Sequence, residues 1–292
     1  MCLEVEISTF CSFSFFYIAF SDAYVTSVAS KPYSKDMSVR RPLEYSTEKL
    51  SNVLKWRKES GATELLERLS LANGPDSAPE AKSNPEALAK GKALVAALNC
   101  GGCYWHGLTK DGKPVLWVRT NRLPWYPDVD ALIKSLVLLA DTGISLMPKQ
   151  TTDFVAIAET SSPPPPHPTF LISLLNSLIK GYPDRLNTLV SAPTSSIMQV
   201  VMKLLLPLMP NRLADKFFFI GSEEAKEKMA EMLLNGEDDI PTFFGGTCDH
   251  EKYYPDLYYC PNRGKGSLKF DFFGMVDRLK EAKEEYEATH SS

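Results

Sequence analysis

The sequence predicts an α/β fold with a parallel β-sheet. Two short apolar runs, at 186–190 and 216–221, flank a segment of helical length. Short runs bounded by proline or glycine are typical of buried strands, and a helix-length link between them favours a right-handed crossover between parallel strands. The chain has 292 residues, of which 44% are hydrophobic and 23% charged, an ordinary balance for a soluble globular protein.

The N-terminal part is predicted to be largely helical after a tail. Residues 1–42 sustain no helical or strand period, and Lys31-Pro32 and Arg41-Pro42 interrupt them, so we expect a poorly structured tail. From Ser46 a helical stripe runs to Arg57. In chain order, the next predicted elements are a helix at 63–69, a linker rich in proline, serine and alanine at 73–86, and a helix at 86–98.

Strands and helices alternate through the middle of the chain. Asp111-Gly112 is typical of a hairpin turn. The elements predicted after it are strands at 113–119 and 153–158, helices at 128–139 and 169–180, an acidic helix at 223–234 capped by Ser222, a short strand at 242–244, and an amphipathic helix at 269–288.

The segment from Ser195 to Met209 is the most unusual in the chain. Between residues 197 and 206 its polar residues are Gln199 and Lys203, and Pro207 interrupts the helix that the segment predicts. A helix that is apolar nearly all round must be buried or must meet apolar material on both faces. It is therefore either an ordinary core helix or a helix that covers an apolar chamber.

Four motifs carry a family resemblance. They are Tyr182-Pro-Asp-Arg-Leu186, Ala192-Pro193, Lys216-Phe217 and Ile240-Pro-Thr-Phe-Phe-Gly-Gly246. Their order and spacing resemble the CRAL-TRIO lipid-binding domain of phosphatidylinositol and phosphatidylcholine transfer proteins. The resemblance implies a mostly parallel sheet of about five strands that floors a hydrophobic lipid pocket, a small N-terminal helical lobe, and a mobile gate helix.

The same resemblance implies a division of the chain and a set of site residues. We expect a tail over 1–42, a partial helical lobe and linker over 43–95, the lipid-binding domain over 96–250, and a C-terminal extension over 251–292. The family pattern places Asp184, Arg185 and Lys216 at the lipid headgroup, although Asp184 and Arg185 taken alone could equally be a surface pair. The gate helix and pocket lining would comprise Ile197, Met198, Val201, Met202, Leu204, Leu205 and Leu208.

One departure from the family pattern bears on the ligand. Leu43 and Glu44 stand where the family places a basic pair, which in inositol-lipid binders helps to hold the headgroup phosphate. An acidic residue there would repel a phosphate, so the departure argues against specificity for phosphatidylinositol.

The predicted function is therefore non-enzymatic lipid binding. We expect a cytoplasmic protein that associates transiently with membranes, binds one phospholipid or similar hydrophobic ligand, and exchanges it with them. The alternative is an interaction module of the same fold, with a vestigial pocket, that binds a regulatory protein. The sequence contains no nucleophile elbow, P-loop or His-Glu-x-x-His motif, so we expect no catalytic residue, no metal and no cofactor besides the lipid. A net charge of −4 argues against a nucleic-acid partner.

Three further segments allow more than one interpretation. Cys100, Cys103 and His106 could be zinc ligands, with Cys248, His250 or Cys260 as the fourth, but they could also form a redox pair or a glycine-rich loop that leads into a strand. The polyproline segment Pro163–Pro168 is either a spacer or a docking ligand for a protein partner. The apolar run Phe10–Phe20 is too short to span a bilayer and lacks the basic flank of a secretory signal.

Overall fold

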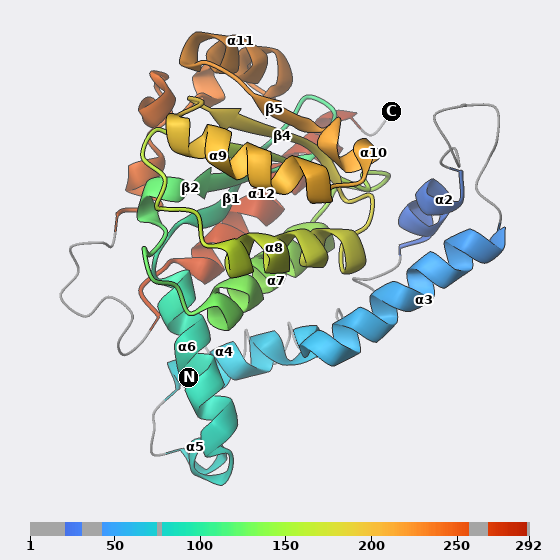
Figure 1. The fold of residues 1–292 in the computed structure, drawn as a ribbon, viewed down its shortest axis with the longest axis vertical. Coiled ribbons are helices and arrows are strands. Elements are labelled where there is room, and N and C mark those ends of the chain that lie inside the picture. The colour runs from blue at the N-terminus through green and yellow to red at the C-terminus, as the bar shows by residue number, and fades with distance from the viewer. Residues whose placement is uncertain (1–20, 31–42, 75–77, 257–267, 291–292) are drawn as a thin grey trace.

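A single five-stranded β-sheet organises the protein (Figure 1). The computed structural model describes residues 21–30, 43–74, 78–256 and 268–290. The first two strands are antiparallel to one another and the remaining neighbours are parallel, which confirms the predicted α/β fold with a mostly parallel sheet. The strands lie side by side in chain order: β1 (Cys103–Leu108), β2 (Pro114–Arg119), β3 (Phe154–Glu159), β4 (Leu186–Ala192) and β5 (Phe217–Phe219).

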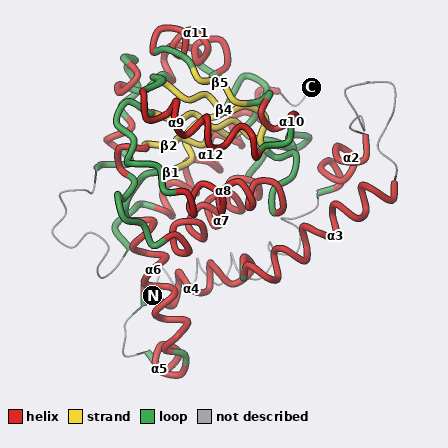
Figure 2. Tube along the Cα trace, viewed as in Figure 1, coloured by secondary structure: helices red, strands yellow, loops and turns green. Residues whose placement is uncertain are grey.

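Helices cover both faces of this sheet (Figure 2). Every residue of β3 is buried, because this central strand has neighbours on both sides and helices over both faces. In Figure 1 one face is covered by α7 (Val129–Ser145), α8 (Pro168–Lys180) and α9 (Ser196–Leu205), and α12 (Phe272–His290) lies behind the sheet. The β4–α9–β5 unit is the predicted crossover, in which Leu189 pairs with Phe217 in parallel.

The N-terminal helices form an arm beneath the sheet (Figure 1). A buried ion pair joins this arm to the main domain, because Arg57 binds Asp141 of α7 through two hydrogen bonds of 2.7 and 2.8 Å. The arm consists of α3 (Leu43–Ser60), α4 (Leu65–Asn73), α5 (Pro79–Ser83) and α6 (Pro85–Leu98). The predicted linker at 73–86 thus contains a short helix of its own.

The N-terminal segment contains a helix that the sequence pattern does not predict. Residues Asp22–Ser30 form α2, in which Tyr24 and Val28 lie one turn apart and are buried. The Tyr24 hydroxyl donates a hydrogen bond of 2.7 Å to the carbonyl of Pro183. The prediction of a poorly structured tail is therefore wrong for this part, because tertiary contacts stabilise a helix whose own periodicity is weak; the rest of 1–42 lies outside the described residues.

Several predicted elements differ locally from the structure. Residues Thr242–Phe244 form a 3-10 helix, η5, and not a strand, because the backbone turns back at Gly245 (φ 77°). Ser222 does not cap α11 (Ser222–Met232) but is its first residue. Helix α12 buries Met275 and Val276 in the core, so the C-terminal extension is part of the main domain. The remaining short helices are η1 (Ala62–Glu64), η2 (Thr120–Arg122), η3 (Leu206–Leu208), α10 (Asn211–Ala214), η4 (Gly236–Asp239) and η6 (His250–Lys252).

Candidate functional site

An apolar cavity of about 260 Å³ lies between the sheet and the layer of α7, α8 and α9. Small side chains of the central strand form part of its floor. Ala156 and Ala158 of β3 line the cavity, whereas the intervening Ile157 points to the other face. This alternation of small and large residues is a signal in the sequence that could have indicated which face of β3 lines a cavity. The other apolar lining residues include Leu116, Leu189, Phe217, Leu132, Leu136, Phe170, Leu174, Met198, Val201 and Leu205.

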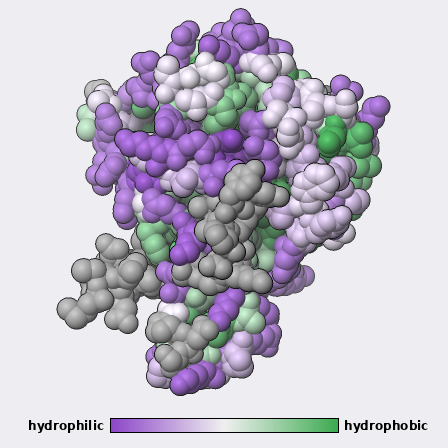
Figure 3. Space-filling view, turned by 90° about the vertical axis from the view of Figure 1, so that its left-hand side faces the viewer, coloured by the Kyte–Doolittle hydropathy of each residue, from purple (hydrophilic) through white to green (hydrophobic). Residues whose placement is uncertain are grey.

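Helix α9 is apolar on both of its faces. Met198, Val201 and Leu205 follow helical spacing and line the cavity. On the other face Val200 and Leu204 are 48% and 47% exposed. Helices α8 and α9 lie at the front of Figure 1, which becomes the right-hand edge of Figure 3. Figure 3 shows hydrophobic residues gathered at that edge of a mostly hydrophilic surface.

The predicted lining set requires a correction. Ile197, Met202, Leu204 and Leu208 do not line the cavity, and three of them, Ile197, Leu204 and Leu208, are exposed. Leu208 lies beyond α9, in η3. Ile197, Met202 and Leu204 belong to α9, but the prediction that they line the pocket is wrong because a helix with 3.6 residues per turn presents one stripe to any one neighbour. The apolar character of the segment did not reveal which stripe this would be.

A second, more polar cleft of about 530 Å³ adjoins the apolar cavity. The two share Leu178, Tyr182 and Leu186 in their walls. Two of the predicted headgroup residues, Asp184 and Lys216, line this cleft together. Four basic side chains and two carboxylates leave the cleft a formal surplus of two positive charges: Lys49, Lys180, Arg212 and Lys216 against Glu48 and Asp184.

The partners of these two residues come from distant parts of the chain. The Asp184 carboxylate binds the Lys49 ammonium at 2.6 Å, and Asp184 adopts a positive φ of 63°. Lys216 donates a hydrogen bond to the carbonyl of Leu186 at the start of β4. Lys49 lies on α3, whereas the exposed Glu44 at the start of that helix does not line the cleft. Lys49 was not among the predicted site residues, because nothing in its local pattern shows that α3 reaches this cleft.

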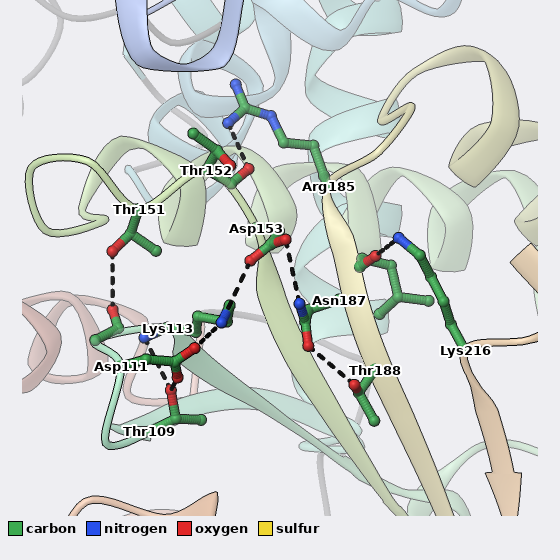
Figure 4. A network of polar contacts seen from close by, with 12 residues as sticks. Thr109, Asp111, Lys113, Thr151, Thr152, Asp153, Arg185, Asn187, Thr188 and Lys216 are labelled. Atoms are coloured by element: carbon green, nitrogen blue, oxygen red, sulfur yellow. Dashed lines mark hydrogen bonds and ion pairs between the residues drawn. The ribbon is translucent and has the colours of Figure 1, made fainter. Parts of the chain in front are cut away.

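The third predicted headgroup residue, Arg185, lines neither cavity. Its guanidinium stacks 3.4 Å above the ring of Tyr24 and donates a hydrogen bond of 2.9 Å to the carbonyl of Thr152. Figure 4 shows Arg185 and Lys216 on opposite sides of β4. Burial lowers the pKa of Arg185 to about 10, so its guanidinium is charged at neutral pH. In this structure Arg185 holds α2 against the main domain.

A buried polar cluster fixes the segment that carries Asp184. The Tyr182 hydroxyl donates to Asp141, 2.8 Å away, on the same carboxylate that binds Arg57. Burial raises the pKa of the Tyr182 hydroxyl, which therefore stays protonated and can donate. The ring of Trp56 meets the Tyr182 ring edge-on at 5.8 Å. The first motif of the family resemblance thus joins the helical arm to the wall of both cavities.

The polyproline segment forms part of the cavity wall. Pro163, Pro164 and Pro166 are half-buried and line the apolar cavity. The neighbouring Trp125 lines the same cavity while remaining 67% exposed. The segment is thus neither a free spacer nor fully available to a partner, and its role as a docking ligand stays a prediction.

The cysteine and histidine motif is divided between the two faces of the sheet. Cys103 lines the apolar cavity, and burial raises the pKa of its thiol well above the usual range. His106 instead contacts His250 on the opposite face, where their ring centroids are 4.3 Å apart. Among the described residues, Cys100 and Cys103 do not form a metal-binding group with His106. Cys260 lies outside the described residues.

An α/β domain that closes an apolar chamber with a helix has the form of a lipid-binding domain. The family model of the CRAL/TRIO domain matches residues 98–246, and the chain belongs to this lipid-binding family, which confirms the resemblance. Among solved structures, the crystal structure of Sfh5 is similar, with a TM-score of 0.47 and 14% sequence identity, covering 82% of this chain and 78% of that one. No curated protein matches the chain.

Proposed function

We propose that the protein carries one lipid, whose apolar part occupies the cavity and whose anionic headgroup occupies the adjoining cleft. The observation that supports this most directly is the position of α9. Its Met198, Val201 and Leu205 close the cavity, while its opposite apolar face is exposed. A helix with apolar side chains on both faces can move from the cavity into a membrane without exposing new apolar surface to water.

The energetics explain why exchange needs a membrane. Burying a methylene contributes ~0.8 kcal/mol, so transferring roughly 30 methylenes of a diacyl lipid from water involves about 24 kcal/mol. A lipid would therefore leave the protein for water extremely slowly. The bilayer interior is as apolar as this cavity, so exchange between the two is close to balanced and headgroup contacts decide selectivity.

The size of the cavity makes movement of α9 part of the proposal. Sites that enclose drug-sized ligands have volumes of roughly 300–1,000 Å³. With α9 in its present position the cavity of about 260 Å³ is smaller than that range, so it holds one acyl chain more readily than two. A diacyl lipid would require α9 to move outward, with Pro207, in the 3-10 turn η3 that follows the helix, as the hinge.

The exposed side of this region suits a membrane surface. Trp125 and Tyr126, at the edge of the cavity, are 67% and 92% exposed, and aromatic side chains of this kind are enriched where proteins meet lipid headgroups. Lys203 lies on the exposed part of α9 and can meet anionic headgroups. In the described parts of the chain, every helix is too short or too polar to cross a bilayer. A cytoplasmic location stays a prediction.

Lipid extraction tests the proposal. The full chain is purified, extracted with organic solvent and analysed by mass spectrometry, and we expect about one lipid per chain. Leu205→Trp fills the cavity and should lower that ratio at least several-fold. Leu204→Trp adds the same side chain on the solvent face one residue away and should leave it unchanged. A purified protein without lipid, or equal losses in both variants, would contradict a ligand in this cavity.

Vesicle exchange tests the membrane part separately. Transfer of a fluorescent lipid between phosphatidylcholine vesicles is measured with and without added anionic lipid. The double variant Val200→Asp, Leu204→Asp places charge on the exposed face of α9 and should slow transfer at least tenfold, while Gln199→Asp serves as the control. If the double variant and the control transfer at equal rates, this face does not contact the membrane, whatever the lipid content of the protein.

A further inference from the structure

A compact group of metal-ligand side chains lies on the face of the sheet opposite the lipid cavity. His106 belongs to β1, His250 begins η6, and Cys248 lies in the loop just before it. One ligand atom from each falls within 4.8 Å of the other two. The Cys248 thiol is 4.0 Å from Nε2 of His106. Cys248 and His250 are two positions apart, but they follow His106 by 142 and 144 positions, so the fold and not the local sequence assembles the group.

Two imidazole nitrogens in this group have no hydrogen-bond partner among the described residues. They are Nδ1 of His106 and Nε2 of His250, and both atoms are buried. His250 is 1% exposed, and its Nδ1 is 3.1 Å from the hydroxyl of Tyr104. Buried polar atoms in native proteins are nearly always satisfied, so the unsatisfied Nε2 of His250 indicates a missing ligand. On His106 the nitrogen that faces the thiol is Nε2, and the unsatisfied Nδ1 is the other nitrogen of the ring.

The chemistry of the three side chains suits a metal ion, because imidazole and thiolate are among the ligands that zinc uses most often in proteins. A neutral imidazole is the form that coordinates metal, and a metal ion can displace the thiol proton.

Charged groups of both signs surround the cluster. Arg119 and Arg122 both bind Glu251, at 2.9 and 2.6 Å, and Arg278 binds Asp271 at 3.1 Å. Two carboxylates, Asp239 and Asp249, act electrostatically on Cys248. These groups are three arginines and four carboxylates, so a cation that brings a thiolate into the site adds no large surplus of positive charge.

We propose that His106, His250 and Cys248 bind one Zn²⁺ ion, with a water molecule as the fourth ligand. Two imidazole nitrogens and one thiolate form a borderline-soft donor set that matches this ion, and binding releases the Cys248 proton. Zinc–ligand distances of about 2.0–2.3 Å require the ligand atoms to approach one another by about 1 Å. Cys248 is half-exposed, so its side chain has space to rotate and make that approach while its backbone stays hydrogen-bonded to Ile240 and Thr242.

The surrounding residues give this site an outer shell and a structural consequence. The Tyr104 hydroxyl can accept the Nδ1 proton of His250, which directs Nε2 toward the metal. A bound ion would tie the segment 248–250 to β1, on the back of the sheet that floors the lipid cavity. The site is separate from the lipid-binding proposal, because Cys248, His250 and His106 do not line that cavity.

Metal titration of the full chain tests the site. The protein is stripped with a chelator, dialysed, and titrated with Zn²⁺ by calorimetry and with Co²⁺ by absorption spectroscopy. We expect one ion per chain and a thiolate-to-cobalt charge-transfer band. Cys248→Ser should abolish that band and weaken Zn²⁺ binding at least tenfold. Cys100→Ser, the control, changes a cysteine outside the group and should retain both.

A variant that keeps all three ligands separates orientation from folding. Tyr104→Phe removes the hydroxyl beside His250 and should weaken Zn²⁺ binding about 10- to 100-fold while the charge-transfer band persists at saturation. The thermal unfolding of each variant is recorded without metal to show that it is folded. The proposal is overturned if the wild-type chain binds neither ion, or if it binds them equally well after Cys248→Ser.

Discussion

The buried ion pair between the helical arm and the main domain makes a sharp prediction about stability. Arg57 and Asp141 are 5% and 2% exposed, and the guanidinium meets the carboxylate through two hydrogen bonds of 2.7 and 2.8 Å. Arg57→Met keeps most of the aliphatic volume but removes both bonds. The Asp141 carboxylate then stays buried, with the hydrogen bond of the Tyr182 hydroxyl still in place.

The expected loss follows from these contacts. Each charge-assisted hydrogen bond contributes about 1.5–3 kcal/mol, and removing one partner of a buried pair typically costs about 3–5 kcal/mol. We therefore expect the free energy of unfolding to fall by about 3–5 kcal/mol. That is a large share of the roughly 5–15 kcal/mol that stabilises a typical protein.

Urea denaturation of the full chain measures this loss, with a control on the same helix. Lys55 and Glu59 of α3 are 3.9 Å apart and their side chains are 74% and 64% exposed. Lys55→Met should cost less than about 0.5 kcal/mol, because water screens such a pair. The double variant Arg57→Met, Asp141→Leu replaces the whole pair with apolar groups and should recover much of the lost stability. If Arg57→Met costs no more than Lys55→Met, the arm is not held by this pair.

Two further substitutions test packing and the gate. Gly143→Ala would place a Cβ 2.2 Å from the Trp105 indole and should lower the free energy of unfolding by about 1–3 kcal/mol. In the control Gly221→Ala, the added Cβ meets no atom within 4 Å and should change the free energy of unfolding very little. Equal urea midpoints for the two variants would contradict the close helix–strand contact. Ser195 caps α9 by accepting a hydrogen bond of 3.3 Å from the amide of Met198. Ser195→Ala should therefore destabilise the closed helix by about 1 kcal/mol and speed lipid exchange roughly fivefold, while Ser195→Asp should restore the slower rate. An unchanged exchange rate in Ser195→Ala would show that opening of α9 does not limit transfer.

The order and type of most elements could be predicted from the sequence because their signals are local. A run such as 153–158 between polar flanks is enough to indicate a buried strand, and a helix ends where proline follows it. The same locality explains the errors. Residues 22–30 have a weak pattern and are helical because Tyr24 and Val28 are buried by distant parts of the chain. Residues 242–244 look like a strand but turn back at Gly245.

The candidate sites depended much more on tertiary structure. Asp184 and Lys216 were predicted from motifs, but their common cleft also contains Lys49, which lies 135 residues before Asp184. The motif neighbours Asp184 and Arg185 face different surroundings, since the backbone at Asp184 has a positive φ and Arg185 turns toward Tyr24.

The sequence alone determined that the segment after Ser195 forms a helix that is apolar nearly all round, because composition and period are properties of the segment itself. Only the tertiary structure decided that Met198, Val201 and Leu205 face the cavity and that His106 meets Cys248. Such choices depend on which surfaces bury the most apolar area and satisfy the most polar groups together. That balance involves the whole chain, and no local pattern records it.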